Sequence, residues 1–183
     1  MREKYQIRFS GAGGQGVILA SVILAKAALS ESLFTAQSQS YGPEARGGVC
    51  KADVIISKNE IDYPYVENAD CVLALTQDSF DRYGLCCKGI VLADSSIDTD
   101  AYKESGTVVC APILRTAAEE VGKAGSANIV AAGAVNALLD IVKAKSLEAA
   151  VLKNVPKGTE ELNIRALREG VNLIGNGCAG DGN

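Results

Sequence analysis

The sequence predicts an α/β fold: a single three-layer domain in which a mostly parallel sheet is flanked by helices. Short apolar runs alternate with helical patterns along the 183 residues, as they do in βαβ units. Hydrophobic residues make up 48% of the chain and aromatic residues 5%, without a tryptophan. Aliphatic side chains must therefore fill the core, which is typical of sheets buried on both faces.

The first half of the chain is expected to open with a strand, a turn and a helix. Residues 5–9 alternate apolar and polar side chains, and residues 17–29 form a long run rich in Ala, Leu and Ile. A second strand is expected at residues 33–37, before a polar loop at residues 38–48. A third strand is expected at residues 49–57, for which residues 60–63 are a candidate antiparallel partner.

The second half repeats short apolar strands and longer helices. Strands are expected at residues 71–75, 90–93 and 107–111, with a short helix at residues 79–83. Pro112 suits the start of the next helix because its missing N–H has no partner there in any case. Later helices are expected at residues 127–142, 146–154 and 159–174. The first of these three lacks a polar face, which predicts a place in the core or in a subunit interface.

No linker divides the chain, so residues 1–175 are expected to form one domain. Gly175 should end the last helix, and residues 176–183 should be a flexible, Gly-rich C-terminal tail. The basic start and the apolar run after it are similar to a signal peptide, but glycines and Lys26 interrupt the run. We therefore expect a cytoplasmic protein.

Composition excludes several classes of function. The net charge is −4 and no Lys/Arg cluster is present, so neither nucleic acid nor a membrane is an expected partner. No apolar run reaches the ~20 residues of a membrane span. The absence of histidine removes Ser-His-Asp triads and histidine-ligated metals. The six cysteines form no C-x-x-C pair, so we expect reduced, mostly buried thiols and no metal site or iron–sulfur cluster on this chain.

The turn between the first strand and helix carries a G-x-G-x-x-G pattern, which is typical of Rossmann-like domains. Its glycines would allow a close approach to helix N–H groups, which bind anions. The predicted anion-binding residues are Gly11, Gly13, Gly14, Gln15 and Gly16. A dinucleotide would also need an acid at the end of the second strand, where this chain has Gln37 and Ser38. A dinucleotide, another anion and simple tight packing all stay open as interpretations of the turn.

The second notable segment is the polar loop at residues 38–48, which is long for a βα connection. Long loops on a rigid framework are often functional, although an ordinary surface loop is the alternative. Arg46 offers a forked donor for phosphate or carboxylate. The residues expected to face an active site or an interface are Ser40, Tyr41, Gly42, Pro43, Glu44, Gly47 and Gly48.

Together, these two segments resemble the γ subunit, or γ-type domain, of the 2-oxoacid:ferredoxin oxidoreductases, the pyruvate/2-oxoglutarate ferredoxin oxidoreductase family. The resemblance extends from about Ile7 to Gly175 and includes the segments at residues 70–75 and 128–134. It implies a complex that decarboxylates a 2-oxoacid, forms an acyl-CoA and reduces ferredoxin.

The resemblance also implies how work is divided within that complex. Thiamine diphosphate and Mg²⁺ would lie on α- and β-type subunits, and Fe–S clusters on β or on a ferredoxin-like δ subunit. The γ chain would carry no cofactor of its own and would help to hold coenzyme A through the glycine turn and Arg46. A separate short γ chain favours 2-oxoglutarate, with pyruvate and indolepyruvate as alternatives. A free-standing nucleotide-binding oxidoreductase and a pure assembly subunit are the competing interpretations.

Overall fold

The computed structural model describes residues 2–40, 48–104 and 106–177. A six-stranded sheet in the order β2-β3-β1-β4-β5-β6 runs through this part of the chain. Strands β1, β4, β5 and β6 are parallel neighbours, whereas β3 is antiparallel to both β1 and β2. The bounds are β1 Lys4–Ala12, β2 Phe34–Ser40, β3 Val49–Ser57, β4 Cys71–Ala74, β5 Ile90–Asp94 and β6 Thr107–Ala111.

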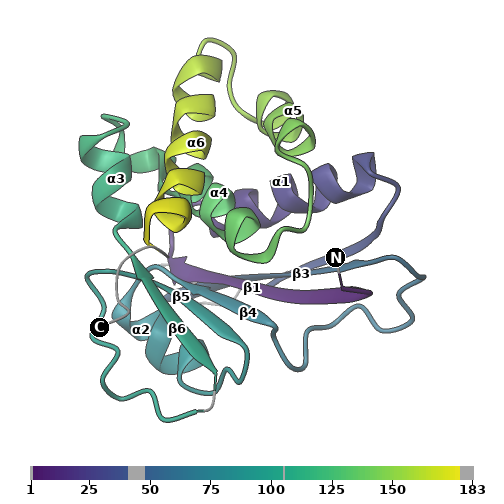
Figure 1. Ribbon diagram of the computed structural model, residues 1–183, viewed down its shortest axis with the longest axis vertical. Helices are drawn as coiled ribbons and strands as arrows, with labels where there is room; N and C mark the ends of the chain where they lie inside the picture. The colour runs from purple at the N-terminus through teal and green to yellow at the C-terminus, as the bar shows by residue number, and fades with distance from the viewer. Residues whose placement is uncertain (1, 41–47, 105, 178–183) are drawn as a thin grey trace.

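The helices are divided unequally between the two faces of this sheet. Figure 1 shows α1, α3, α4, α5 and α6 above the sheet, and α2 below it. The bounds are α1 Val17–Ser30, α2 Gln77–Ser79, α3 Ile113–Glu119, α4 Ala127–Leu139, α5 Ala144–Asn154 and α6 Glu160–Gly177. A π-helical turn, η2, continues α2 over Phe80–Gly84, and a 3₁₀ turn, η3, precedes α4 at Ala124–Ser126. The predicted three-layer α/β domain is confirmed, and its third layer consists of the short α2 and η2 turns.

The two faces of the sheet carry separate apolar cores. Tyr5, Ile7 and Phe9 are buried in the larger core, which fills the space between the sheet and the five helices. The smaller core lies on the other face and gathers apolar side chains of β4, β5 and η2, among them Val72 and Phe80. The helix at residues 127–142, expected in the core or an interface, contributes α4 to the larger core, where it packs on α6, α1 and α3.

The second strand and the loop after it differ from the expectation. β2 continues through Ser40, and β3 pairs back along it in antiparallel register, Ser40 opposite Lys51. The loop is therefore a hairpin connection and not a βα connection. The suggested partner at residues 60–63 is wrong, because no strand forms there and β3 pairs with β1 and β2 instead. Pro64, which has no N–H to donate to a ladder, follows that segment directly.

Two helix ends and one short helix also differ from the expectation. α4 ends at Leu139 and not at residue 142, because Asp140 takes a left-handed conformation with φ 49°. α6 continues through Gly175 to Gly177. The expected helix at residues 79–83 is a single capped turn, α2, followed by the π-helical turn, in which Leu85 N–H donates to the Phe80 carbonyl five residues earlier. Periodicity cannot distinguish such short helices from one another.

Candidate functional site

The two segments singled out in the sequence meet at one edge of the sheet. In the β1–β3 ladder, Gly11 lies opposite Cys50 and Ala12 opposite Val49. The glycine turn leaves β1 after Ala12, and the hairpin loop enters β3 just before Val49. This edge is the carboxyl end of the parallel strands, where ligands bind in open α/β sheets. Of the loop, Tyr41, Gly42, Pro43, Glu44, Ala45, Arg46 and Gly47 lie outside the described residues, whereas Ser40 and Gly48 lie inside them.

The glycine turn is closed by its own glutamine. The Gln15 N–H donates to the Ala12 carbonyl at 3.2 Å, and the Gln15 side-chain oxygen accepts the Ala12 N–H at 2.7 Å. The side chain of Gln15, predicted as an anion-binding residue, is thus engaged with the backbone of β1. Gly13 and Gly14 are exposed at the tip of the turn, and they are the part that an approaching ligand would meet.

The glycines of the turn serve different purposes. A Cβ on Gly11 would collide with the Gln15 side-chain oxygen, and one on Gly16 would lie 2.6 Å from the Asn128 amide nitrogen. Both positions therefore require close packing. Gly14 has φ +91°, but no heavy atom lies within 4 Å of where its Cβ would be. The positive φ therefore disfavours a side chain at residue 14, but no neighbouring atom of the described chain does.

The N-terminus of α1 opens beside this turn without a side-chain cap. Gly16 occupies the N-cap position in a left-handed conformation, and the first turn of the helix contains no acidic residue. The first N–H groups of a helix have no partner within the helix. They carry partial positive charge and favour an anion. This arrangement fits the phosphate chemistry that the glycine pattern predicts.

A hollow of about 530 Å³ adjoins the hairpin and α2. Gly48 and Val49 line one side, and Asp78, Asp81 and Arg82 line the other. The two carboxylates would repel a phosphate in this hollow. The electrostatics thus favour the glycine turn over this hollow as the place for an anion.

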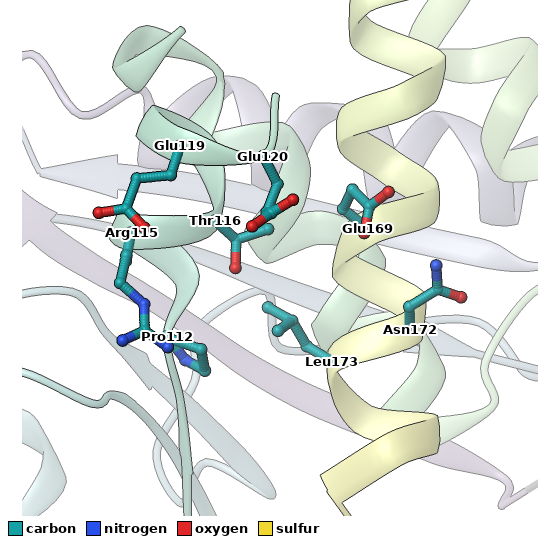
Figure 2. Close-up of a pocket in the computed structure, with 8 residues that line it drawn as sticks. All are labelled: Pro112, Arg115, Thr116, Glu119, Glu120, Glu169, Asn172 and Leu173. Carbon is teal, nitrogen blue, oxygen red and sulfur yellow. The ribbon is translucent and has the colours of Figure 1, made fainter. Parts of the chain in front are cut away.

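A second cavity, of about 260 Å³, lies between α3 and α6 and begins next to β6 at Pro112. Figure 2 shows Glu119 of α3 and Glu120, which follows it, on one side and Glu169 of α6 on the other. Arg115 is the cation at this cavity. The three carboxylates that line the cavity would repel a phosphate or carboxylate ligand.

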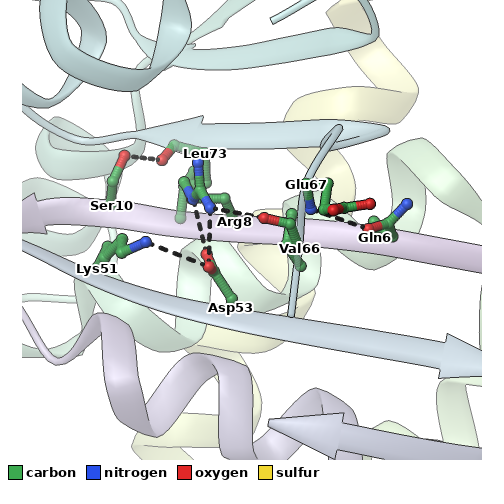
Figure 3. A network of polar contacts seen from close by, with 8 residues as sticks. All are labelled: Gln6, Arg8, Ser10, Lys51, Asp53, Val66, Glu67 and Leu73. Atoms are coloured by element: carbon green, nitrogen blue, oxygen red, sulfur yellow. Dashed lines mark hydrogen bonds and ion pairs between the residues drawn. The ribbon is translucent and has the colours of Figure 1, made fainter. Parts of the chain in front are cut away.

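An ion pair at the middle of β1 and β3 was not predicted from the sequence. Arg8 donates from Nε to Asp53 Oδ1 at 2.7 Å and from Nη2 to Asp53 Oδ2 at 2.8 Å, as Figure 3 shows. Both side chains are mostly buried, with exposed fractions of 16% and 7%. Lys51 joins the pair at 3.5 Å from Asp53. The hydrogen bonds that Arg8 donates to Asp53 raise the pKa of Arg8 further, so Arg8 is always charged.

A second buried acid, Asp94 at the end of β5, has a structural role. Its Oδ1 accepts the N–H and the hydroxyl of Ser96 at 3.0 and 2.6 Å, and its Oδ2 accepts the Leu114 N–H at 2.8 Å. Asp94 is 2% exposed. A carboxylate at the first turn of a helix stabilises it, so Asp94 fixes the start of α3 to the sheet. In the sequence, the acidic residue at the end of an apolar strand is the feature that could have predicted this role.

The cysteines of the described chain divide into buried or partly buried thiols and exposed ones. Burial raises the pKa of the Cys71, Cys87 and Cys50 thiols, which therefore stay protonated at neutral pH. Cys86 and Cys110 are exposed. Across residues 2–40, 48–104 and 106–177, no three His, Cys, Asp or Glu side chains come together as metal ligands. Nor does this part of the chain contain a helix long and apolar enough to cross a membrane.

Comparison with known proteins decides the family. The family model described as pyruvate ferredoxin/flavodoxin oxidoreductase matches residues 6–173. The chain belongs to this family. It is 45% identical over 175 residues to the 2-oxoglutarate synthase subunit KorC of Methanocaldococcus jannaschii, covering 93% of this chain and 94% of that one.

Solved structures agree with this placement. The γ subunit of a keto/oxoacid ferredoxin oxidoreductase from Geobacter sulfurreducens superposes with a TM-score of 0.87 at 41% identity, covering 96% of this chain and 99% of that one. The 2-oxoglutarate:ferredoxin oxidoreductase of Magnetococcus marinus, with 2-oxoglutarate, coenzyme A and succinyl-CoA bound, shares the fold. Its TM-score is 0.86 at 20% identity, over 96% of this chain and 32% of that one. Within the family, our chain is a γ-type subunit of the 2-oxoacid:ferredoxin oxidoreductases.

The strand order argues against the dinucleotide alternative. In a dinucleotide-binding domain the second strand lies directly beside the first, and an acid at its end reaches the ribose. Here β3 lies between β1 and β2. Two strand spacings, about 10 Å, therefore separate β2 from β1, and β2 ends in Gln39 and Ser40. The glycine turn thus has no adjacent strand end with an acidic residue, which NAD recognition needs.

Proposed function

We propose that this chain is the γ subunit of a cytoplasmic complex that converts 2-oxoglutarate to its acyl-CoA and reduces ferredoxin, and that its glycine turn and hairpin loop hold coenzyme A. Thiamine diphosphate, Mg²⁺ and Fe–S clusters belong in this proposal to α- and β-type partners and a ferredoxin-like δ subunit. The substrate rests on the 45% identity to a 2-oxoglutarate synthase subunit.

One observation carries the coenzyme A proposal: the β1–β3 ladder holds the glycine turn beside the base of the hairpin. Val49 lies opposite Ala12, so the uncapped end of α1 and the segment that contains Arg46 start from neighbouring positions. Backbone N–H groups at a helix N-terminus and guanidinium groups both donate hydrogen bonds to phosphate in proteins. Coenzyme A carries phosphates on a long flexible chain and therefore suits such donors.

The first test is the KM for coenzyme A in the assembled enzyme with Arg46→Ala. Loss of a charge-assisted hydrogen bond to phosphate should raise that KM by about tenfold or more, while the KM for the 2-oxoacid stays the same. Arg115→Ala, which removes an exposed arginine of α3, is the matched control. An Arg46→Ala enzyme with unchanged kcat and unchanged KM for coenzyme A would remove Arg46 from the proposal.

Gly14→Val tests the turn itself. The chain leaves room for a side chain at residue 14, so the variant should fold with only the strain of a positive φ, about 1–2 kcal/mol. Its side chain would project into the space that a ligand or partner needs. We expect weaker coenzyme A binding or impaired assembly. A variant that assembles and turns over normally would make the turn a packing device only.

Substrate and partners are tested by one anaerobic co-purification of the tagged chain from its native cells. The eluate should contain α- and β-type subunits, thiamine diphosphate and iron, and it should reduce a dye with 2-oxoglutarate faster than with pyruvate or indolepyruvate. A preference for another 2-oxoacid would overturn the substrate only. A chain that elutes alone and colourless would overturn the assignment to a complex.

A further inference from the structure

The outer side of β2 is an open strand edge. In the described part of the chain, β2 pairs with β3 on one side and with no strand on the other. Proteins usually block such an edge with lysine, proline, a bulge or a very short strand. β2 has seven residues and an unbroken register with β3, and it contains neither a charged residue nor a proline. Its outer side is therefore open to pairing with another strand.

The register identifies which backbone groups lie on this edge. Opposite residues of antiparallel strands alternate between hydrogen-bonded and non-hydrogen-bonded pairs. The Lys58 N–H donates to the Glu3 carbonyl at 2.9 Å, so the even-numbered residues of β3 direct their backbone groups to β1. The odd-numbered residues of β3 therefore bond to the residues of β2 opposite them, which are even-numbered. The N–H and C=O groups that face outward from β2 are those of Thr35, Gln37 and Gln39.

An accessible apolar stripe runs along α1. Ile18, Val22 and Leu29 share one face of the helix by their spacing. Ile18 and Val22 are half-buried, and Leu29 is 57% exposed. The helix contains one charged residue, Lys26, which is hydrogen-bonded to α5. Accessible apolar residues that lie together, and are not scattered singly, mark interaction surfaces.

Two hydrogen bonds place the α1 stripe beside the β2 edge. Ser21 lies next to the stripe, and its hydroxyl accepts a hydrogen bond from Nε2 of Gln37 at 3.2 Å. Lys26 lies on the other side of the stripe and donates to Asn154 of α5. At about 100° per residue, the stripe lies between these two directions. It therefore faces outward between β2 and α5, with the middle of α1 next to the middle of β2.

We propose that the β2 edge and the α1 stripe bind a second copy of this chain, with the two β2 strands antiparallel across a two-fold axis at Gln37. Closed two-fold dimers are the commonest homo-oligomers. This axis sets Thr35 opposite Gln39 and Ala36 opposite Ser38 of the second copy, and Gln37 opposite itself. Only uncharged residues meet, so no like charges oppose the pairing. The surface is self-complementary in this register, and the proposal does not depend on the coenzyme A site.

The same axis brings the two α1 stripes together. α1 packs on β2 and β3 from above (Figure 1), and the bond between Gln37 and Ser21 places the axis beside the middle of the helix. Val22 therefore lies close to Val22 of the second copy. Strand pairing supplies directional hydrogen bonds, and the stripes supply apolar burial. One strand edge and one helix side make an interface at the low end of specific sizes, so the dimer should depend on concentration.

Sedimentation equilibrium of the full-length chain, at concentrations up to about 1 mM, measures the dissociation constant of the dimer. Val22→Lys places like charges at the axis and should raise that constant by about tenfold or more. Val171→Lys, the same substitution at a 40% exposed residue of α6, is the matched control and should leave it unchanged. A chain that stays monomeric, a dimer that survives Val22→Lys, or one that Val171→Lys weakens equally would overturn the proposal.

Disulfide cross-linking tests the axis and the register. Hydrogen-bonded opposite residues of antiparallel strands have Cα atoms about 5.5 Å apart, within reach of a disulfide. Gln37→Cys should therefore link two copies under mild oxidation, in a chain whose exposed cysteines, Cys86 and Cys110, are replaced by serine. Thr35→Cys is the control, because the two residues 35 are four positions out of register, about 13 Å along the strand. Equal linkage at residues 35 and 37, identified by peptide mass spectrometry, would overturn the proposal.

The assembled complex distinguishes a second copy from another subunit at this edge. A photoreactive label is attached to the thiol that Gln37→Cys introduces, and the captured peptide is identified by mass spectrometry. Capture of the β2 segment of a second copy is the expected result. Capture of a subunit of another kind would assign the edge to that subunit and overturn the proposal.

Discussion

The Arg8–Asp53 ion pair joins β1 and β3, the two strands that hold the glycine turn beside the hairpin loop. Arg8 lies opposite Asp53 in the β1–β3 ladder, and the segment after β3 covers it through the Val66 carbonyl. In the sequence, Arg8 occupies a polar position of an alternating strand, which predicts a solvent-exposed side chain. The covering segment has no regular structure of its own, so no periodic pattern could have predicted the burial of this pair.

Asp53→Asn should destabilise the protein strongly. It leaves the mostly buried guanidinium of Arg8 without its countercharge, which costs about 3 kcal/mol of unfolding free energy for a buried pair. Chemical denaturation of the isolated chain measures it. The control is Glu148→Gln, which removes the exposed pair with Arg168 and should change stability by less than about 1 kcal/mol. Equal effects of the two substitutions would show that burial of the Arg8 pair has no energetic consequence.

Thiol reactivity should separate the cysteines by burial. Burial raises the pKa of Cys71 and Cys87, so the reactive thiolate forms at higher pH in these residues than in a free cysteine. At neutral pH, the exposed Cys86 and Cys110 should be alkylated while the buried Cys71 and Cys87 stay unlabelled in the folded chain. Mass spectrometry of the labelled peptides measures each rate. Labelling of Cys71 at the rate of Cys86 under native conditions would contradict the burial that the structure gives it.

At the scale of the element, two glycines set how closely the backbones of α4 and α6 approach each other. A Cβ on Gly133 of α4 would collide with the Leu167 carbonyl, and one on Gly170 of α6 would collide with the Val130 carbonyl. The two helices therefore approach backbone to backbone at reciprocal glycines. The sequence predicted both helices from their apolar positions, but the crossing depends on which small residues face each other, and periodicity alone does not give that.

Gly133→Ala should lower the unfolding free energy by about 1–3 kcal/mol, because the added methyl forces the two backbones apart. Gly175→Ala is the control within α6, since no atom lies within 4 Å of its added Cβ. That control should leave stability unchanged or raise it by up to about 1 kcal/mol, because alanine favours the helix. Thermal or urea unfolding of both variants checks the difference. A stable Gly133→Ala protein would show that the crossing tolerates a wider separation.

Most strands and helices followed from the sequence, but the pairing of β2 and β3 did not. The helical patterns were long enough to identify five helices within a few residues, although α2 and η2 were too short. Residues 38–40 belong to the polar run, with its glycines and proline, that predicts a loop, yet the ladder with β3 extends β2 through Ser40. Pairing partners depend on the whole sheet, which a local pattern does not contain.

At the scale of the whole molecule, the strand order determines which ligands the glycine turn can accept. Both notable segments were predicted to be functional, and the structure brings their bases together. Their proximity was not predictable, because it depends on β3 entering the sheet between β1 and β2. Because β3 occupies this place, β2 does not lie beside β1, where the second strand of a dinucleotide-binding domain lies.

NADH should therefore leave the thermal midpoint of the isolated chain unchanged. A ligand that binds only the folded form must raise that midpoint by mass action, and a turn without an adjacent acidic strand end offers the nicotinamide dinucleotide no ribose contact. Differential scanning fluorimetry with and without excess NADH measures the shift. A midpoint that rises with NADH concentration would restore the free-standing oxidoreductase as an interpretation.

The β2–β3 hairpin has a consequence for engineering this chain. Its two ends are clamped by a ladder of seven residue pairs, from Phe34 with Ser57 to Ser40 with Lys51. The register of the sheet therefore does not depend on the residues between Ser40 and Gly48, and lengthening such a closed connection costs little entropy. The tip of a relative with another 2-oxoacid preference could be transplanted at these two boundaries. Each such chimaera would keep the same sheet, and its 2-oxoacid preference and KM for coenzyme A would show whether the transplanted segment takes part in recognition.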